Sequence, residues 1–180
     1  MKSKMVYGFW VLFLLGFQEY CEGRLLASSE PDINNVAGYA RWLVSQSTWG
    51  VLSTLSVELE GSPFGNVVSY SDGVPGKRSG IPEHPLGTCG DVDPENPNCA
   101  KITLTGKTVL LETSLEEWGF AQAALFTMHP EMKWWPTSHG FRIFKLEIEN
   151  IFIINGPGGP KPLTVDEYLK YKVSIKVGIL

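Results

Sequence analysis

The residues between Ser69 and Pro82 are of the types that bind phosphate. The stretch reads SYSDGVPGKRSGIP, and it brings glycines and small hydroxyls close to the pair Lys77 and Arg78, directly after an apolar run. Glycine-rich loops hold phosphate with backbone N–H groups, and a nearby cation adds charge-assisted hydrogen bonds. Two interpretations follow: the loop holds the phosphate of a nucleotide or a flavin, or it only turns the chain.

The usual signatures of catalytic loops are absent from the sequence. No G-x-G-x-x-G opens a helix after a strand, and neither G-x-x-x-x-G-K-[ST] nor G-x-S-x-G occurs. The histidines His84, His129 and His139 have no spacing to acids and serines that would single out a triad. His129 precedes Pro130 and His139 precedes Gly140, where an imidazole often only bonds to the backbone of a turn. A catalytic or metal-binding histidine is the alternative.

The first 23 residues have the pattern of a secretory signal peptide. Two lysines precede an apolar run from Met5 to Phe17, and small residues follow at Cys21 and Gly23. We predict cleavage after Gly23, which leaves one domain of residues 24–180. The run is shorter than the roughly 20 apolar residues that a membrane span needs, so a membrane anchor is the less favoured alternative. The predicted location is the secretory pathway, outside the cell or in a vacuole or lysosome.

Cleavage leaves Cys89 and Cys99 as an even pair in an oxidising compartment, which predicts a disulfide between them. The proline-rich, acidic loop between them cannot pack a core, and cross-linking its ends would stabilise the fold by about 2–3 kcal/mol in the chain-entropy model. Zinc bound with the help of His84 is the alternative. Structural zinc usually takes four ligands with paired close spacing, and three at best are available here, so we expect no metal site.

The overall charge argues against nucleic acid as a partner. The chain of 180 residues has a formal net charge of -4, and its lysines and arginines are scattered, so no basic stripe is present to neutralise phosphates. With 43% apolar residues, the chain suits one globular domain with its own core.

The hydrophobic pattern predicts a helix and a hairpin ahead of the glycine-rich loop. Asn34 or Asn35 can cap a helix that ends near Gln46. Residues 49–59 alternate and residues 66–71 form a second strand, so 49–71 is predicted to be a hairpin that turns at Gly61, Ser62 and Pro63. The residues expected on one side of the first strand are Val51, Ser53, Leu55, Val57 and Leu59.

Two more strands follow the cysteine loop. Residues 101–111 form one, with Gly106 at a tight turn or bulge, and residues 141–154 form the other, with Asn150 breaking the register.

Two capping boxes predict the remaining helices. Thr113 begins one that must stop before Pro130, and Thr164 begins a short one that ends near Lys170. Strands separated by turns, with two or three helices inserted, favour an α+β domain that is mainly antiparallel β and of barrel type.

Trp134 and Trp135 lie between prolines in an irregular stretch, HPEMKWWPTSHG. Such a pair could stack on a flat ligand. Packing within the protein or contact with a partner is the more common use of tryptophan at such a position.

Several segments spread over most of the chain form a recognisable set. In order, they are WGVLSTLS (49–56), SPFGNVVSYSDG (62–73), SGIP (79–82), HPEM with WP and SH (129–139), FRIFKLEIENIFII (141–154) and GGPK (158–161). Together they resemble the CREG family of secreted glycoproteins. The resemblance implies a split β-barrel related to pyridoxamine 5'-phosphate oxidase, whose members bind flavin mononucleotide (FMN) at a homodimer interface. It further implies a barrel and homodimer without flavin or catalysis, acting as a secreted or endolysosomal factor linked to growth or differentiation.

Three departures from the family pattern bear on function. The flavin-using relatives carry cations in an R-x-V-x-L-K pattern where this chain has residues 66–71, so no cofactor is expected. If FMN does bind, as in an FMN-dependent oxidoreductase, its phosphate must rely on Asn66, Ser69, Ser71 and Arg78. A strand and a helix are also missing after Pro82, which indicates an internally shortened form, and no N-x-[ST] glycosylation site occurs.

Overall fold

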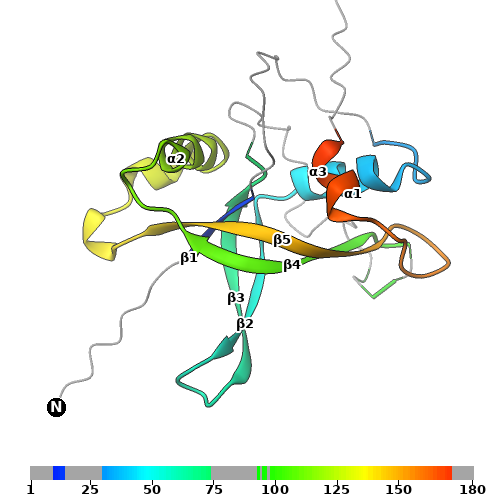
Figure 1. The fold of residues 1–180 in the computed structure, drawn as a ribbon, viewed down its shortest axis with the longest axis horizontal. Helices are drawn as coiled ribbons and strands as arrows, with labels where there is room; N and C mark the ends of the chain where they lie inside the picture. Colours follow the sequence, from blue (N-terminus) through cyan, green and yellow to red (C-terminus); the bar gives the residue numbers. More distant parts are fainter. Residues whose placement is uncertain (1–9, 15–29, 74–92, 94, 97, 172–180) are drawn as a thin grey trace, which may run out of the picture.

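The computed structural model describes residues 10–14, 30–73, 93, 95–96 and 98–171. Its strands form one sheet in the order β2-β3-β1-β5-β4. Helix α2 lies over one end of the long β4–β5 ribbon, and α1 and α3 lie together over the other end (Figure 1). The elements are β1 (Trp10–Leu14), α1 (Val36–Ser45), β2 (Trp49–Ser56), β3 (Ser62–Ser71), β4 (Lys101–Leu110), α2 (Glu116–Met128), the 3-10 helices η2 (Pro130–Trp134) and η3 (Thr137–His139), β5 (Arg142–Ile154) and α3 (Val165–Lys170).

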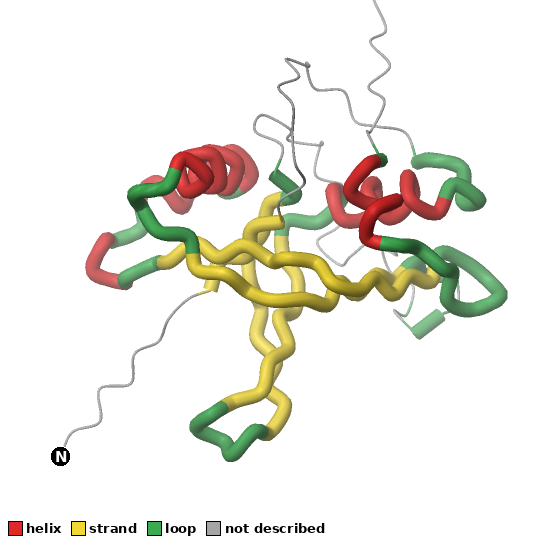
Figure 2. The backbone as a smooth tube through the Cα atoms, viewed as in Figure 1, coloured by secondary structure: helices red, strands yellow, loops and turns green. Residues whose placement is uncertain are grey.

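The predicted α+β class and the predicted hairpin are confirmed. Strands β2 and β3 pair antiparallel from Trp49 opposite Ser69 to Ser56 opposite Ser62. The turn was placed too late, because β2 already ends at Ser56 and β3 already begins at Ser62. Val57 and Leu59, predicted to be in the first strand, therefore lie in the turn, where Glu60 and Gly61 have φ values of 53° and 84°. Figure 2 shows the hairpin projecting away from the three α-helices.

The barrel expectation is met only in part. The pairs β2–β3 and β4–β5 are antiparallel, but β1 runs parallel to both of its neighbours, β3 and β5. Strands β2 and β4 are the two edges of this sheet, so the described strands do not close into a barrel. Strand β1 also lies inside the segment predicted to be a signal peptide.

The two irregular positions predicted for β4 and β5 meet at one bulge. Thr105 pairs with Asn150 and Gly106 pairs with Ile148, so Glu149 is the extra residue on β5. A Cβ atom on Gly106 would lie 1.9 Å from the backbone oxygen of Glu147. Only glycine permits this close approach of the two backbones.

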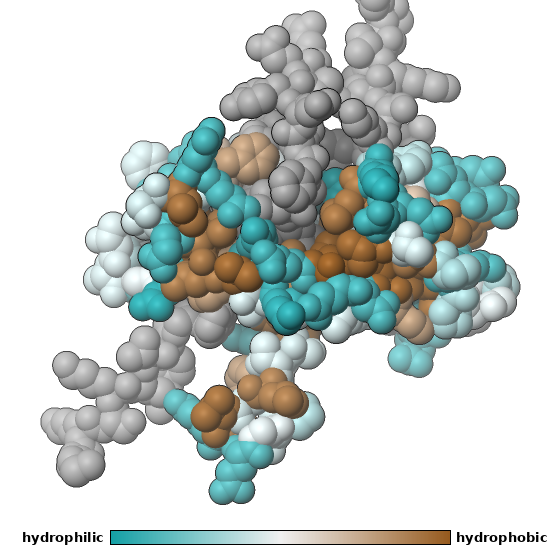
Figure 3. Space-filling model, viewed as in Figure 1, coloured by the Kyte–Doolittle hydropathy of each residue, from teal (hydrophilic) through white to brown (hydrophobic). Residues whose placement is uncertain are grey.

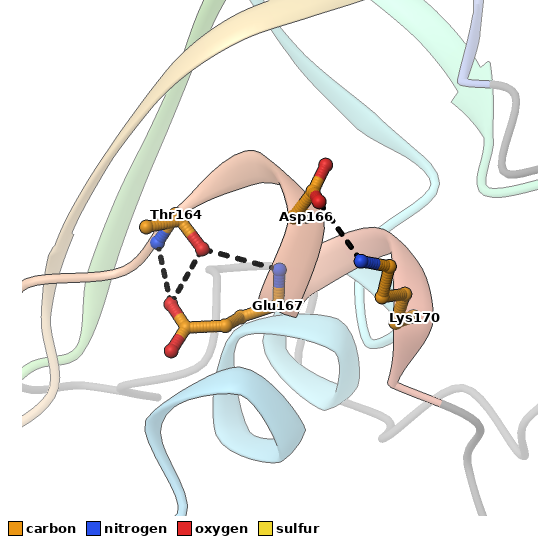
Figure 4. A network of polar contacts seen from close by, with 4 residues as sticks. All are labelled: Thr164, Asp166, Glu167 and Lys170. Atoms are coloured by element: carbon orange, nitrogen blue, oxygen red, sulfur yellow. Dashed lines mark hydrogen bonds and ion pairs between the residues drawn. The ribbon is translucent and has the colours of Figure 1, made fainter.

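Two of the three α-helices begin at the capping residues that the sequence predicts. Asn35 caps α1 by accepting the Gly38 N–H at 3.0 Å. Thr164 forms the predicted capping box of α3, in which its Oγ1 accepts the Glu167 N–H at 3.2 Å and the Glu167 carboxylate accepts the Thr164 N–H at 2.9 Å (Figure 4). The box predicted at Thr113 is wrong, because a turn from Glu112 puts Leu115 at the N-cap of α2, without a side-chain cap.

The core lies on the side of β5 that the helices cover. At one end, α1 and α3 pack on β5. At the other end, α2 and η2 pack around Leu125, Met132 and Ile143. In the part of the chain that the structure describes, no helix is long and apolar enough to cross a membrane. The buried residues of the larger cluster are Tyr39, Ala40, Val44, Leu146, Ile151, Ile153 and Tyr168.

Candidate functional site

The residues proposed for a flavin phosphate do not converge. Asn66 is exposed, and its Oδ1 accepts the neighbouring Val67 N–H at 2.9 Å. Because successive residues of a strand face opposite sides, Ser69 and Ser71 lie on the other face of β3. Ser71 is fully buried, and its Oγ lies 3.3 Å from the Gly73 nitrogen that donates to it. Arg78 lies outside the described residues.

His129 has a structural role. Its ring is buried, and Nε2 lies 3.0 Å from the backbone oxygen of Tyr70. A carbonyl oxygen only accepts hydrogen bonds, so Nε2 carries the proton in this contact. The other ring nitrogen, Nδ1, lies 3.5 Å from the Glu131 carboxylate. His139, at the end of η3, is exposed and its ring lies against Phe141.

Buried tyrosines surround the end of β3. The Tyr70 hydroxyl donates to the backbone oxygen of Val44. Burial raises the pKa of Tyr70 far above its usual range, and the nearby charge of Asp72 adds to this effect. Burial also raises the pKa of Tyr168, while Arg41, whose guanidinium lies 5.0 Å from the centre of that ring, opposes the rise. Neutral phenols in such surroundings build a core rather than exchange protons near pH 7.

The two tryptophans divide between core and surface. Trp135 is half-buried and stacks on Phe141 with ring centres 4.5 Å apart, next to the cluster of Leu125 and Met132. Trp134 is 85% exposed. Only Trp134 is therefore available for contact with another molecule.

One face of the β2–β3 hairpin is apolar and open to solvent. Residues paired across two strands share a face, and the register pairs Val51 with Val67 and Leu55 with Pro63. Val51 is 64% exposed, Leu55 72% and Val67 59%, and Trp49 at the end of the same face is also exposed. We call Trp49, Val51, Leu55 and Val67 the hairpin face. Figure 3 shows hydrophobic groups exposed on the projecting hairpin, among paler and hydrophilic ones.

The sequence located the hairpin face but not its exposure. The alternation of Val51, Ser53 and Leu55 was visible, and alternation normally marks the side that faces a core. Here no described helix covers that side of the hairpin. Alternation shows that residues share a side, and only the packing of other elements decides whether that side is buried.

Only one of the two cysteines of the predicted disulfide has a described position. Cys99 is buried, and Cys89 and His84 lie outside the described residues. The disulfide between Cys89 and Cys99 stays a prediction. Among the residues with a described position, no three histidine, cysteine or acidic side chains gather as metal ligands would.

The described residues form an α+β fold, in which one sheet has helices over both ends and a projecting hairpin. The family described as "CREG, beta-barrel" matches residues 31–84 and 81–170. The chain belongs to the CREG family. It is 35% identical to Protein CREG1 of Homo sapiens, over 81% of this chain and 78% of that protein. It is 33% identical to Protein CREG2 of Homo sapiens, over 83% of this chain and 61% of that protein.

Among solved structures, the fold resembles a heme binding protein from Mycobacterium smegmatis. The TM-score is 0.55 at 21% identity, over 78% of this chain and 61% of that chain. A second solved structure matches with a TM-score of 0.51 at 18% identity, over 79% of this chain and 100% of that chain. At these identities the likeness concerns the fold alone.

The comparisons also bear on the missing segment. The alignment to human Protein CREG1 spans 176 positions, whereas 81% of 180 residues is about 146, so about 30 aligned positions have no residue of this chain. The two matched pieces of the family meet at residues 81–84, between β3 and β4. This is where the sequence departs from the family pattern after Pro82.

Proposed function

We propose that this chain is a non-catalytic binding protein of the secretory pathway, delivered outside the cell or to a vacuole or lysosome. It acts as a CREG-type regulatory factor linked to growth or differentiation. Family membership supports the type of protein, and the leader-like pattern of residues 1–23 supports the route. The hairpin face is the contact surface, and Trp134 is a second exposed anchor.

The observation that carries this proposal is the exposed hairpin face itself. A two-stranded hairpin is only marginally stable in water by itself, and its apolar side chains gain free energy when another surface covers them. Contiguous exposed apolar surface on a soluble domain marks a site of interaction. Trp49, Val51 and Val67 adjoin one another on one side of the two paired strands, and Leu55 lies beyond the Ser53–Gly65 pair on that side.

A second copy of the chain is the partner that this face fits. A flat apolar strand surface is complementary to itself across a two-fold axis, and the two-fold homodimer is the commonest oligomer of soluble proteins. The hairpin face has no charged side chain among its members, so two copies would bury no unpaired charge. We therefore propose a homodimer that packs hairpin face on hairpin face.

Sedimentation velocity of two matched variants tests this proposal. Leu55→Glu puts a carboxylate on the hairpin face, and Thr54→Glu puts the same charge on the opposite side of β2, where Thr54 is exposed. We expect Leu55→Glu to raise the dimer dissociation constant by at least about tenfold, because a buried unpaired carboxylate is costly. Thr54→Glu should leave that constant nearly unchanged. Equal behaviour of the two variants, or an unmodified chain that is monomeric at every concentration, would contradict the homodimer.

Binding of a flavin or a related flat cofactor is the second candidate function. It is favoured by the likeness in fold to a heme binding protein. The residues of this chain do not fit such a group, because Asn66 and Ser69 face opposite sides of β3 and Nε2 of His129 is occupied by the Tyr70 oxygen. An FMN-dependent oxidoreductase therefore has no phosphate site among the described residues from which a mechanism could be built.

A further inference from the structure

Residues Trp10–Leu14 form the central strand of the sheet. Strand β1 pairs in parallel with β3, from Val11 opposite Ser69 to Phe13 opposite Ser71. On its other side it pairs in parallel with β5, from Trp10 opposite Arg142 to Leu14 opposite Leu146. Among the described strands, the antiparallel pairs β2–β3 and β4–β5 are joined into one sheet through these five residues.

Without β1, the sheet would have two unsatisfied edges that face each other. The backbone N–H and C=O groups of 69–71 and 142–146 that point toward β1 would lose their partners. Two of the flanking residues, Ser71 and Leu146, are buried in the complete sheet, so loss of β1 would newly expose these strand edges. The space between β3 and β5 is therefore a slot that requires an extended strand.

The shortening of the chain falls next to one wall of the slot, directly after β3 in the sequence. About 30 positions of the alignment to the relatives are missing here, and the matched pieces of the family meet at residues 81–84, after β3 and before β4. A segment of that length is long enough for a strand of five or six residues with its connections. The N-terminal apolar run supplies a strand that this part of the chain lacks.

We propose that the slot between β3 and β5 is a strand-accepting site and that residues 10–14 of the same chain occupy it. An intact N-terminus then completes the sheet within one molecule. Cleavage after Gly23, as predicted for a signal peptide, removes the central strand and opens the slot. Processing of the leader thus decides whether the sheet is continuous. This inference concerns a different surface from the hairpin face, and its processing step rests on the leader cleavage of the proposed secretory route.

Hydrogen exchange on the full chain of residues 1–180, read by mass spectrometry, tests the proposal. In the unmodified chain, the amides of residues 69–71 and 142–146 should exchange slowly. Leu12→Pro removes the N–H in the middle of β1, where neighbouring strands lie on both sides, at Tyr70 and Phe144. We expect exchange at Ser69, Ser71 and those amides of 142–146 that point toward β1 to become faster by at least about tenfold in this variant. The Tyr70 amide, which donates to the Thr48 oxygen, should stay protected. Glu116→Pro, at the exposed first position of α2 where proline is tolerated, is the control for the substitution and should change neither segment.

Exchange elsewhere in the molecule shows whether the variant still folds. Lys101 to Thr105 pair with Asn150 to Ile154, away from β1, and their amides should stay protected in Leu12→Pro. If the variant loses protection there as well, a full chain with a protease site inserted after Gly23 replaces it. We then expect the released N-terminal peptide to co-elute with the body of the protein.

Three results would overturn the proposal. The first is unchanged exchange at 69–71 and 142–146 in Leu12→Pro. The second is a cleaved peptide that separates from the body without any change in exchange at those residues. The third is protection of those residues that rises with protein concentration, because it would assign the slot to a strand from a second copy.

Discussion

The Nε2 atom of His129 lies 3.0 Å from the backbone oxygen of Tyr70 and joins the end of α2 to the end of β3. The His129 ring is buried and the bond is partly buried, so removing the ring takes a donor away from the Tyr70 oxygen in a place with little access for water. We expect His129→Ala to lower the free energy of unfolding by about 1–3 kcal/mol, and His129→Gln, which keeps an N–H donor, to recover part of it. His139→Ala, at an exposed site, should stay within about 0.5 kcal/mol. Urea denaturation measures all three, and equal stability of His129→Ala and His139→Ala would contradict the structural role of His129.

The bulge between β4 and β5 predicts opposite effects for two glycines. Gly106→Ala would put a Cβ atom 1.9 Å from the Glu147 oxygen, so we expect a loss of about 2–4 kcal/mol in the free energy of unfolding. Gly119, in the middle of α2, has no atom within 4 Å of the position of a Cβ. Gly119→Ala should therefore stabilise by about 0.5–1 kcal/mol. Thermal unfolding of both variants is the measurement, and a Gly106→Ala protein as stable as the unmodified chain would show that the bulge is not as described.

The buried tyrosines predict a loss of stability at high pH. Burial, with help from Glu30, raises the pKa of Tyr39 to about 12, and burial raises the pKa of Tyr70 further. Both folded values exceed the ordinary value of about 10, so the unfolded chain releases these protons first. Their stabilising contribution is complete below about pH 10 and is lost as the pH rises toward the folded pKa values.

Tyr70→Phe separates this titration from general alkaline unfolding. We expect the variant to be less stable at neutral pH, because the bond to the Val44 oxygen is lost, but to lose less stability above about pH 10 than the unmodified chain does. Denaturant unfolding across this pH range gives both quantities. An identical slope against pH in the two proteins would mean that Tyr70 does not contribute.

Trp134 and Trp135 are expected to affect different quantities, Trp134 the contact with another molecule and Trp135 the free energy of unfolding. Trp134 is 85% exposed, so Trp134→Ala should change the free energy of unfolding by less than about 0.5 kcal/mol. Trp135 stacks on Phe141, and Trp135→Ala should cost about 2–4 kcal/mol. Chemical denaturation measures both, and any effect of Trp134→Ala on self-association then reports on contact rather than on folding.

Helix starts and the bulge could be predicted where a residue type has a single structural role at that position. Asn35 and Thr164 mark helix starts because their side chains satisfy free backbone donors, and Gly106 marks a bulge because no larger residue fits there. Thr113 had the same pattern as Thr164 but failed, because the turn from Glu112 moves the helix start to Leu115. The local sequence pattern does not show whether a capping box or a preceding turn sets the start of the helix.

The candidate site could be predicted only in its parts. The sequence singled out Asn66, Ser69 and Ser71 together, but the alternation of a strand puts Asn66 on the other face from the two serines. The place of residues 10–14 in the sheet could not be predicted, because pairing between segments far apart in the chain depends on which edges the rest of the fold leaves open. An apolar run that serves as a leader and one that serves as a strand look alike in sequence.

A thermal unfolding scan of the full chain, with and without excess FMN, bears most directly on the non-catalytic assignment. A ligand that binds only the folded state at a hundred times its dissociation constant adds about 2.7 kcal/mol of stability, which raises the midpoint by several degrees. We predict one cooperative transition with the same midpoint in both samples, because Asn66, Ser69 and Ser71 do not converge on a phosphate. A clear rise of the midpoint with FMN would show that the folded chain binds flavin, contradict the expectation of no cofactor and favour the flavin-dependent oxidoreductase.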